Sequence, residues 1–447
     1  MMAAGQERTN QKKPELVLQS TVAADRLHGV YQQRQSELYM QRIKIPGGRI
    51  QWQQWQVIAQ LQERFTSDTP VHLTTRQDIE LHNLRLDDTV KVQQALIDAG
   101  LSVYGACGDS LRNITVCPGC GFCKDGWDVF AVSEAVKNYL QSRPAILNLP
   151  RKFKISFSGC RQNCAKPYLN DIGFIAVSEE HFEAVVGGSL GPVPALGIKA
   201  YERLPVSDIF ALCCAAVEMF VEYGDRKNRR KARFRHVREK LGDDVFLNEL
   251  NKRFREAKNK EPQPELNLLT KTNSDFKLLH RLNIPDGDIS AEQILLLADS
   301  CRSYGIESRI NFEHGIELYG LEPLKLPESL KVFESGPIII CCPGNRNCPF
   351  GLINCQSAAL KIRNSFANDK RFNNVRINIS GCPNNCAHSA AAAIGLVGLK
   401  RNKKDCIRLY TGGGNGRNQN LAQKRGIETV ENIASLNGLI FFQSQQH

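Results

Sequence analysis

The chain carries the same series of sequence signals in each of its halves, and this repeat restricts its fold more than any other feature. Residues 45–50 (IPGGRI) recur as residues 284–289 (IPDGDI), and a stretch of helical periodicity follows each of them. A strand pattern ending in Ile-Glu-Leu comes next, at residues 79–81 and 316–318. A Cys-x5-Cys pair and then a Gly-Cys-x3-Cys pair complete each series. Because chance rarely produces such an ordered set twice, the sequence indicates an internal duplication.

The repeat predicts an α+β fold built from two kinds of module. Each half begins with a small strand–helix–strand module, and a larger α/β module follows, with its cysteines in loops at strand ends or helix starts. A mainly helical connection over residues 205–264 joins the halves. The predicted order is a polar N-terminal tail (1–37), half-module 1 (38–105), α/β module 1 with the helical connection (106–264), half-module 2 (265–337), α/β module 2 (338–430) and a C-terminal tail (431–447).

The composition is that of a soluble globular protein, with 42% hydrophobic and 23% charged residues. No run of about 18 apolar residues occurs, so the sequence predicts no membrane insertion. The N-terminal residues lack the apolar core of a secretory signal, and we expect a cytoplasmic location. In such a reducing compartment, clustered cysteines usually bind metal instead of forming disulfides. The cysteines outside the clusters are expected to be small buried hydrophobic residues.

Two cysteine pairs in the second half have the spacing of an iron–sulfur site. Five residues separate Cys342 from Cys348, and three separate Cys382 from Cys386, which lie in a tight turn after a predicted strand. A [4Fe–4S] cluster needs four thiolates from short loops, because each iron takes one cysteine sulfur. Structural zinc usually has about two to four residues between paired ligands. The spacing therefore favours iron and sulfur, and zinc stays as the alternative.

This arrangement resembles the cluster signature of the sulfite and nitrite reductase family, over about residues 38 to 415. The resemblance implies the duplicated sulfite reductase fold, in which two ferredoxin-like half-modules and two α/β modules are related by a pseudo-two-fold axis. It also implies two cofactors, a [4Fe–4S] cluster and a sirohaem. In that family the last cysteine bridges the cluster to the sirohaem iron, and this role falls on Cys386.

The first half contains the cations that the resemblance assigns to substrate binding. These are Arg76 in TTRQ, Arg112 in LRN, and Lys152 and Lys154 in RKFK. Arginine suits a bidentate oxyanion, and lysine can also deliver a proton. Basic residues two apart on a strand more often form an exposed face, but here they occur together with the cluster signature. The second-half counterparts are Glu313, Pro337, Asn374 and Arg376, so the sequence predicts one catalytic site at the interface between the halves.

Four further residues resemble positions that the family keeps near the carboxylates of the macrocycle. Arg42, Lys44 and Arg49 flank the first Ile-Pro-Gly-Gly segment, and Asn384 lies between the last two cluster cysteines. Their alternative role is as ordinary surface residues.

The first half also has a complete cysteine set, Cys117, Cys123, Cys160 and Cys164. A second [4Fe–4S] cluster is the favoured interpretation, with zinc or free thiols as alternatives. Cys120 makes residues 117–123 resemble the C-x2-C-x2-C run of ferredoxins, so it is an alternate ligand.

The resemblance implies six-electron reduction of a small anion. Sulfite reduction to sulfide is the first prediction, because Lys154 follows Lys152 where nitrite reductases of the family tend to have Asn. Nitrite reduction to ammonia is the alternative. A precorrin-3B synthase-like enzyme of the corrinoid pathway is a further one, although the complete cation set argues against it. A basic metal-binding scaffold is the non-enzymatic alternative.

Electrons must come from another protein, because the sequence has no flavin or nicotinamide fingerprint. The formal net charge is +12, and residues 226–240 alone carry nine Lys or Arg. An acidic ferredoxin docking on this basic surface is the expected donor, and a solvated helix face is the ordinary alternative. No zinc-finger or helix-turn-helix pattern accompanies the charge, so nucleic acid is not an expected partner.

Overall fold

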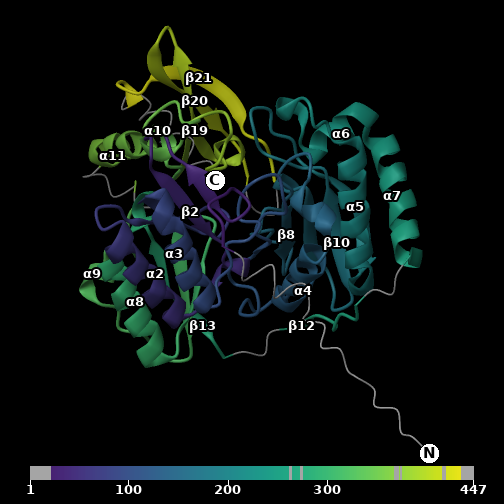
Figure 1. Ribbon diagram of the computed structural model, residues 1–447, viewed down its shortest axis with the longest axis horizontal. Helices are drawn as coiled ribbons and strands as arrows, with labels where there is room; N and C mark the ends of the chain where they lie inside the picture. The colour runs from purple at the N-terminus through teal and green to yellow at the C-terminus, as the bar shows by residue number, and fades with distance from the viewer. Residues whose placement is uncertain are drawn as a thin grey trace, which may run out of the picture.

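The computed structural model describes residues 22–260, 264–271, 275–366, 372, 375–414 and 419–433. Figure 1 shows three parts: the two small modules packed together, the first α/β module with its helices, and the second α/β module above the small modules. Within the described residues, no helix has both the length and the apolar character needed to cross a membrane. Most of the predicted C-terminal tail and most of the N-terminal tail lie outside the described residues.

The two small modules have matching element orders and exchange a strand. In each, an Ile-Pro-x-Gly turn leads into a two-residue strand that pairs with the sheet of the other module, β3 with β15 and β14 with β4. The first module contains β1 (Val30–Gln32), β2 (Tyr39–Ile43), β3 (Arg49–Ile50), α2 (Trp52–Phe65), β4 (Val71–Leu73), β5 (Ile79–Leu84) and α3 (Leu86–Asp98). The second contains β13 (Lys277–Asn283), β14 (Asp288–Ile289), α8 (Ala291–Tyr304), β15 (Glu307–Ile310), β16 (Gly315–Gly320) and α9 (Glu328–Lys331).

The strand exchange explains why the Ile-Pro-x-Gly turn occurs in both halves. Gly48 has φ +73°, and a Cβ there would lie 2.3 Å from the Ile310 carbonyl oxygen of the other module. Its counterpart Gly287 has φ +80°, and a Cβ there would lie 2.7 Å from the Leu73 carbonyl oxygen. Only glycine tolerates both the left-handed backbone and this close approach.

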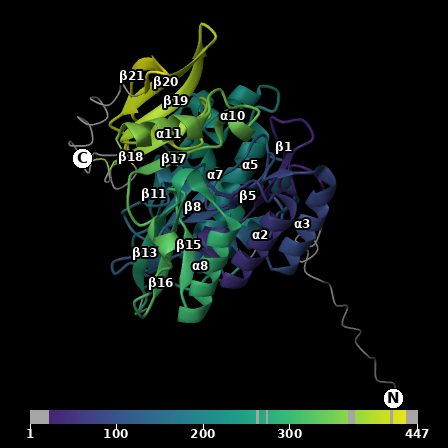
Figure 2. The ribbon, with the colours of Figure 1, turned by 90° about the vertical axis from the view of Figure 1, so that its left-hand side faces the viewer.

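A single hydrophobic core lies between the two small modules. Helices α2 and α8 pack side by side, as Figure 2 shows, and buried residues of both modules form one continuous cluster. The buried indole of Trp55 donates a hydrogen bond to Ser308 Oγ of the other module at 2.9 Å. Because neither small module encloses this core alone, the two small modules share one hydrophobic core.

The two α/β modules contain sheets of identical topology. The strand orders are β6-β8-β9-β10-β11 and β17-β18-β19-β20-β21, with the first three strands parallel and the last three antiparallel. The first sheet consists of β6 (Thr115–Val116), β8 (Ile155–Ser158), β9 (Ile172–Ala176), β10 (His181–Val186) and β11 (Ile198–Pro205). The second consists of β17 (Ile338–Cys341), β18 (Arg376–Ser380), β19 (Ile394–Arg401), β20 (Lys404–Thr411) and β21 (Gln423–Thr429). A helix crosses between the parallel strands of each sheet, α4 (Phe130–Gln141) and α11 (Cys355–Ser365). The predicted duplicated fold is confirmed.

The helical connection packs on the first α/β module. It comprises α5 (Ile209–Tyr223), α6 (Phe234–Leu241) and α7 (Asp243–Lys260), and α5 packs against α4 and α7. A short strand, β12 (Thr270–Lys271), then pairs with β7 (Trp127–Asp128) before the chain enters the second small module.

Two expectations from the sequence need correction. The basic segment 226–240 is not simply a solvated helix face, because Arg233 and Arg235 are buried. The predicted tail 1–37 ends too late, because β1 already pairs with β2 and the Arg34 guanidinium donates to the Gly351 carbonyl of the second half. The Gln-rich composition hid β1, which is a short strand at the edge of its sheet.

Candidate active site

Arg76 and Arg112 are fixed by backbone and amide oxygens. Arg76 lies in the β4–β5 turn and donates to Asn170 Oδ1 at 3.0 Å and to the Asn113 carbonyl at 2.6 Å. Arg112 donates to the carbonyls of Ala106 and Gly108 at 3.0 and 2.9 Å. Since neither guanidinium has an ion-pair partner among the described residues, both keep their positive charge for an anion.

Lys152 and Lys154 approach the same region from the extended segment before β8. Burial, opposed by the nearby Cys386 thiol and reinforced by Arg112, lowers the pKa of Lys152 to about 7. Burial and the charges of Arg76 and Lys152 hold the pKa of Lys154 well below its usual range. Two ammonium groups that readily lose a proton therefore lie close together, as the resemblance implied.

The helical connection adds a cation that the sequence analysis did not single out. Arg233, at the start of α6, is buried and forms an ion pair with Asp171 at 2.8 Å. The same Asp171 carboxylate accepts a hydrogen bond from the Lys154 backbone N–H at 2.8 Å. The charge of Arg233 also lowers the pKa of Lys152 and Lys154, after the larger effect of burial. Only its position in a dense basic run hinted at this role.

The second half closes the site from the other side. The Thr75 hydroxyl, beside Arg76, donates to the Cys386 carbonyl at 2.9 Å. Lys166 Nζ donates to His388 Nδ1 at 2.9 Å, across 222 positions of the chain. The small pocket between them is lined by residues of both halves: Thr75, Arg76, Lys154 and Lys166 from the first, and Phe312 and His388 from the second. The predicted cations and the predicted bridging cysteine are thus neighbours.

The second-half cysteines Cys342, Cys348, Cys382 and Cys386 come together at the carboxyl ends of β17 and β18. The Gly381 backbone N–H donates to Cys342 Sγ at 3.1 Å. A hydrogen bond from Cys355, with further bonds from the Gly381 and Gly344 backbone, lowers the pKa of Cys342 to about 6 in spite of burial. Such a pKa favours the thiolate that iron requires. Desolvation and the neighbouring cysteine thiols raise the pKa of Cys382 to about 12 when no metal is bound.

The first-half set is equally close together. Cys117 interacts electrostatically with Cys120 and Cys164, and Cys123 with Cys160. Within the described residues, no three His, Cys, Asp or Glu side chains in either half converge tightly enough to hold a single ion. The cysteines outside the two sets are all buried: Cys107, Cys213, Cys214, Cys301, Cys341, Cys355 and Cys406.

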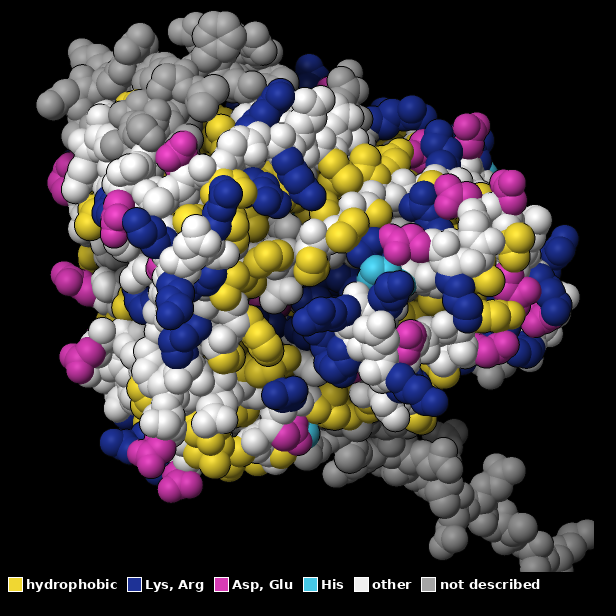
Figure 3. All heavy atoms as spheres, turned by 90° about the horizontal axis from the view of Figure 1, so that it is seen from above, with side chains coloured by type: hydrophobic (Ala, Val, Ile, Leu, Met, Phe, Trp, Pro, Cys, Tyr) yellow, Lys and Arg dark blue, Asp and Glu magenta, His cyan; other side chains and the backbone are white. Residues whose placement is uncertain are grey.

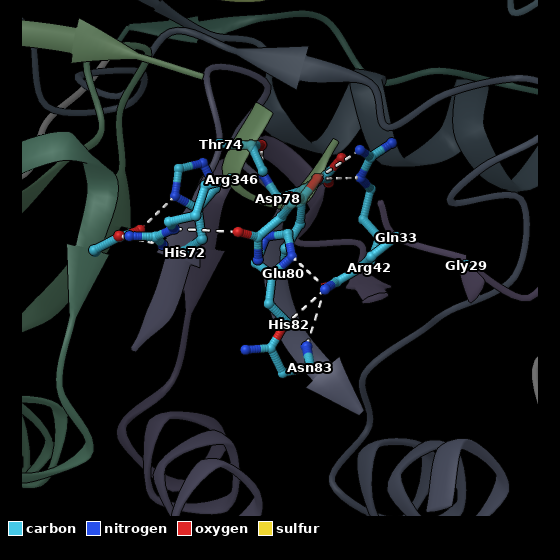
Figure 4. A network of polar contacts seen from close by, with 12 residues as sticks. Gly29, Gln33, Arg42, His72, Thr74, Asp78, Glu80, His82, Asn83 and Arg346 are labelled. Carbon is cyan, nitrogen blue, oxygen red and sulfur yellow. Dashed lines mark hydrogen bonds and ion pairs between the residues drawn. The ribbon is translucent and has the colours of Figure 1, made fainter. Parts of the chain in front are cut away.

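Arg42 and Lys44 lie beside the cation pocket. Figure 4 shows Arg42 paired with Glu80, which also contacts His82. Although burial opposes the effect, Arg42 and His82 hold the pKa of Glu80 well below its usual range. Lys44 is 2% exposed, and its Nζ has no hydrogen-bond partner among the described residues. Burial lowers the pKa of Lys44 to about 7.

The structure does not bring Arg49 and Asn384 into this group. Arg49 stacks on Phe130 at 3.7 Å and lies 3.5 Å from Glu307, next to the first cysteine set. Its strand β3 is the exchanged one, which carries the side chain into the other half-module. Asn384 is exposed, and its backbone N–H donates to the Cys382 thiol.

A family model described as the nitrite and sulphite reductase 4Fe-4S domain matches residues 107–258 and 338–437. A second, described as the nitrite/sulfite reductase ferredoxin-like half domain, matches residues 31–99. The chain belongs to the nitrite and sulfite reductase family. Membership of this family confirms the predicted cofactors, sirohaem and a [4Fe–4S] cluster.

Curated relatives in this family are named as ferredoxin-dependent nitrite reductases. The protein from Synechococcus elongatus is 28% identical, over 86% of this chain and 82% of its own length. The chloroplastic protein from Zea mays is 26% identical, over 88% of this chain and 76% of its own length. The solved NirA protein of Mycobacterium tuberculosis matches 92% of this chain and 85% of its own with a TM-score of 0.76 at 19% identity, which supports the fold.

The residues present suit both cofactors of the family. Sirohaem carries many carboxylates, and the pocket is rich in cations whose buried nitrogens lack partners among the described residues, namely Lys44 Nζ and the Nε atoms of Arg76, Arg112 and Arg233. Two buried carboxylates, Asp78 and Asp171, are the anions that act on these cations. Figure 3 shows Lys and Arg side chains gathered in a hollow near the middle of one face. The excess positive charge fits a polyanionic macrocycle and a small anionic substrate.

Proposed function

We propose that this protein reduces nitrite to ammonia in six electron transfers, with a ferredoxin as electron donor in a reducing cytoplasm. The observation that carries the proposal is the group of interacting buried cations Arg76, Arg112, Lys152 and Lys154, whose two lysines also interact with Cys386. The names of the curated relatives favour nitrite over sulfite, which reverses the order expected from the sequence.

The four cations divide the work between binding and proton supply. Arg76 and Arg112 have planar guanidinium groups that suit the oxygens of the anion, and we assign them to its orientation. Lys152 and Lys154 lie where protons are needed as oxygen leaves the substrate as water, and their lowered pKa values suit proton transfer near neutrality. When bound, sirohaem and its cluster supply the electrons and the metal at which the anion is reduced. The Asp171 carboxylate holds the cations in place, because it accepts a hydrogen bond from the Lys154 backbone N–H and forms an ion pair with Arg233.

Sulfite reduction to sulfide is the second candidate, and Lys154 is the observation that favours it. Sulfite carries more charge and loses more oxygen than nitrite, so a second ammonium group in the pocket benefits sulfite more. A precorrin-3B synthase-like activity is disfavoured by the complete cation set.

Steady-state rates with nitrite and with sulfite, using reduced viologen and then reduced ferredoxin, test the proposal. We expect fast ammonia formation and slow or no sulfide formation. Sulfide formation that exceeds ammonia formation would reject nitrite in favour of sulfite. Protein made with sufficient iron but lacking extractable sirohaem would reject both reductase activities.

The variant Lys154→Asn separates the two anions further. Removing one proton donor should lower any sulfite rate about 100-fold and leave the nitrite rate within a few-fold of the parent. Lys199→Asn is the matched control, because Lys199 on β11 is exposed, pairs with Glu183 on β10 and does not line the pocket. Equal losses for both anions would contradict a role for Lys154 in choosing between them.

A further inference from the structure

We propose that the first-half cysteines hold a second [4Fe–4S] cluster, without a second haem, and that it relays electrons to the catalytic pair. The ligands assigned are Cys117, Cys123, Cys160 and Cys164. The relay role rests on the proposed reductase activity, whereas the cluster itself does not.

The backbone around these cysteines has the same hydrogen bonds as the catalytic set. The Gly159 N–H donates to Cys117 Sγ at 3.2 Å, as that of Gly381 donates to Cys342 Sγ at 3.1 Å. Three more bonds recur at matching positions. The Cys117 N–H donates to the Phe157 carbonyl as the Cys342 N–H donates to the Ile379 carbonyl, both at 3.2 Å. The Cys123 N–H donates to the Gly119 carbonyl at 2.8 Å, and the Cys348 N–H donates to the Gly344 carbonyl at 3.0 Å. The Asn163 N–H donates to the Cys160 carbonyl at 3.2 Å, and the Asn385 N–H donates to the Cys382 carbonyl at 3.3 Å.

The turns that present the last two cysteines also match in their dihedral angles. Asn163 and Asn385 both have φ +56°, and Lys166 and His388 have φ +54° and +61°. A left-handed backbone conformation is unfavourable for a residue with a side chain. Because both turns have this conformation at the same two positions, the two loops have the same shape. The first half thus keeps the shape of the cluster site as well as its cysteines.

Cys120 contacts the Cys117 thiol but has hydrogen-bond partners of its own outside the ligand set. Its Sγ accepts a hydrogen bond from the Val129 N–H at 3.1 Å and lies 3.2 Å from the Asp128 carboxylate. The residue at its position in the second half is Asn345, which is not a ligand type for iron. The geometry therefore favours the Cys-x5-Cys pair over the ferredoxin-like run.

A ring of packed side chains supports the loop 117–123. The Arg309 side chain is 1% exposed, donates to the Pro118 carbonyl at 2.6 Å and stacks on Phe122 at 4.1 Å. The Phe122 ring in turn stacks on Tyr319, with ring centroids 4.7 Å apart. Burial of an arginine costs desolvation free energy unless the charged group has partners. The buried Arg309 has partners in the loop 117–123 and fixes this loop, in which Cys123 is exposed.

Among the described residues, the second-half counterparts of Arg76 and Lys154 do not form a group of free cations like the one beside Cys386. Where the first half has Arg76, the second has Glu313, and this carboxylate is paired with Arg376, the counterpart of Lys154, at 3.0 Å. Phe312, in the place of Thr75, packs under Lys166 at 5.7 Å. A polyanionic macrocycle would meet a carboxylate and an aromatic ring there. The cluster would then carry single electrons from the donor protein to the catalytic cofactors, with no anion bound to it.

Iron counting on the holoenzyme, purified without oxygen, tests the proposal. Two clusters and one haem require about nine irons and one cluster with one haem about five, since each cubane holds four. We expect about nine irons, about eight acid-labile sulfides, and Mössbauer signals from two distinct clusters. About five irons in protein with full sirohaem absorption would overturn the proposal, and so would zinc in place of the missing iron.

Variants identify the ligands and remain informative whichever anion is reduced. Cys164→Ser should lower the count to about five irons and keep the sirohaem spectrum, whereas Cys120→Ser should keep about nine. If Cys164→Ser fails to fold, the parent iron count and Mössbauer spectrum still decide. The reverse result, with iron lost from Cys120→Ser and kept in Cys164→Ser, would overturn the ligand assignment.

The relay role has its own measurement. Cys164→Ser should lose most of its rate with reduced ferredoxin while its rate with reduced viologen stays within a few-fold of the parent, because a small donor can reach the catalytic cofactors directly. Equal rates with ferredoxin would reject the relay and leave the cluster in place. Failure of the proposed nitrite activity would instead appear with both donors.

Discussion

The two halves of this protein have the same cysteine cradle but different surroundings. Cys386 lies beside Lys152, Lys154 and the Arg76 turn, whereas the second-half counterparts of Arg76 and Lys154 are Glu313 and Arg376, which pair with each other. The backbone bonds around the two cysteine sets agree within a few tenths of an ångström. Duplication therefore preserved the loop geometry, whereas the charged residues around the loops differ between the halves.

The largest expected contrast is between matched cysteine substitutions. Cys386→Ser should abolish anion reduction, by at least about 1000-fold, because Cys386 is the residue that would hold both the cluster and the haem iron. Cys164→Ser should leave reduction with viologen nearly unchanged. Rates with nitrite and visible spectra of both variants check this difference. Similar losses in both would mean that the halves are functionally equivalent.

The next contrast exchanges the charge at one matched position. Arg76→Glu places the second-half residue in the first-half pocket and should lower kcat/KM for the anion about 100- to 1000-fold, since a carboxylate replaces a cation that faces it. Glu313→Gln should change kcat/KM little. A larger loss in Glu313→Gln than in Arg76→Glu would place the substrate beside Cys164.

A smaller contrast concerns two matched ion pairs below the cysteine loops. Arg42 pairs with Glu80 at 2.5 Å and Arg281 with Glu317 at 3.1 Å, but the Arg42 side chain is 23% exposed and that of Arg281 is 46% exposed. Arg42→Ala should cost about 3 kcal/mol of unfolding free energy, because it leaves Glu80 buried and unpaired. Arg281→Ala should cost about 1 kcal/mol or less. Denaturant titration of the two variants gives the comparison.

The last expected effect, a pH dependence of stability caused by Lys44, is small for each pH unit. In protein made without sirohaem, folded Lys44 loses its proton near pH 7 and unfolded Lys44 near about pH 10.4. Between these values the unfolded state binds more protons, so the free energy of unfolding rises with pH by about 1 kcal/mol per pH unit, and this stability is lost as pH falls toward 7. Lys44→Met should remove the slope, stabilise the cofactor-free protein at pH 7 and weaken sirohaem retention. An unchanged slope would contradict the burial of an unpaired ammonium group.

Much of the fold could be predicted from the sequence. The repeated landmarks fixed the module order, because each signal is local: turn residues, a helical period and a strand pattern. The same holds for the four second-half cysteines, whose spacing within short loops is enough to bring their thiols together. The position of Arg49 could not be predicted in this way, because β3 leaves its own module and pairs with β15.

The composition of the pocket also depended on distant segments. Arg233 is 62 positions from its partner Asp171, and Lys166 is 222 positions from His388. Neither pair has a sequence pattern of its own. Arg233, at the start of α6, meets Asp171 only after the first sheet has formed. Lys166 and His388 lie in loops of different sheets, and they meet only after both sheets have formed. The resemblance pointed to Arg76, Arg112, Lys152 and Lys154, and it could not point to groups outside the family's motifs.

The sequence by itself determined the duplication, the cluster spacing and the presence of cations in only one half. These properties are local and need only short-range geometry. The tertiary structure decided which cations face Cys386, that Cys120 accepts a hydrogen bond from Val129, and that Glu313 is neutralised by Arg376. Such relations depend on how two folded halves pack across their pseudo-two-fold axis, and long-range packing leaves no mark in the spacing of residues along the chain.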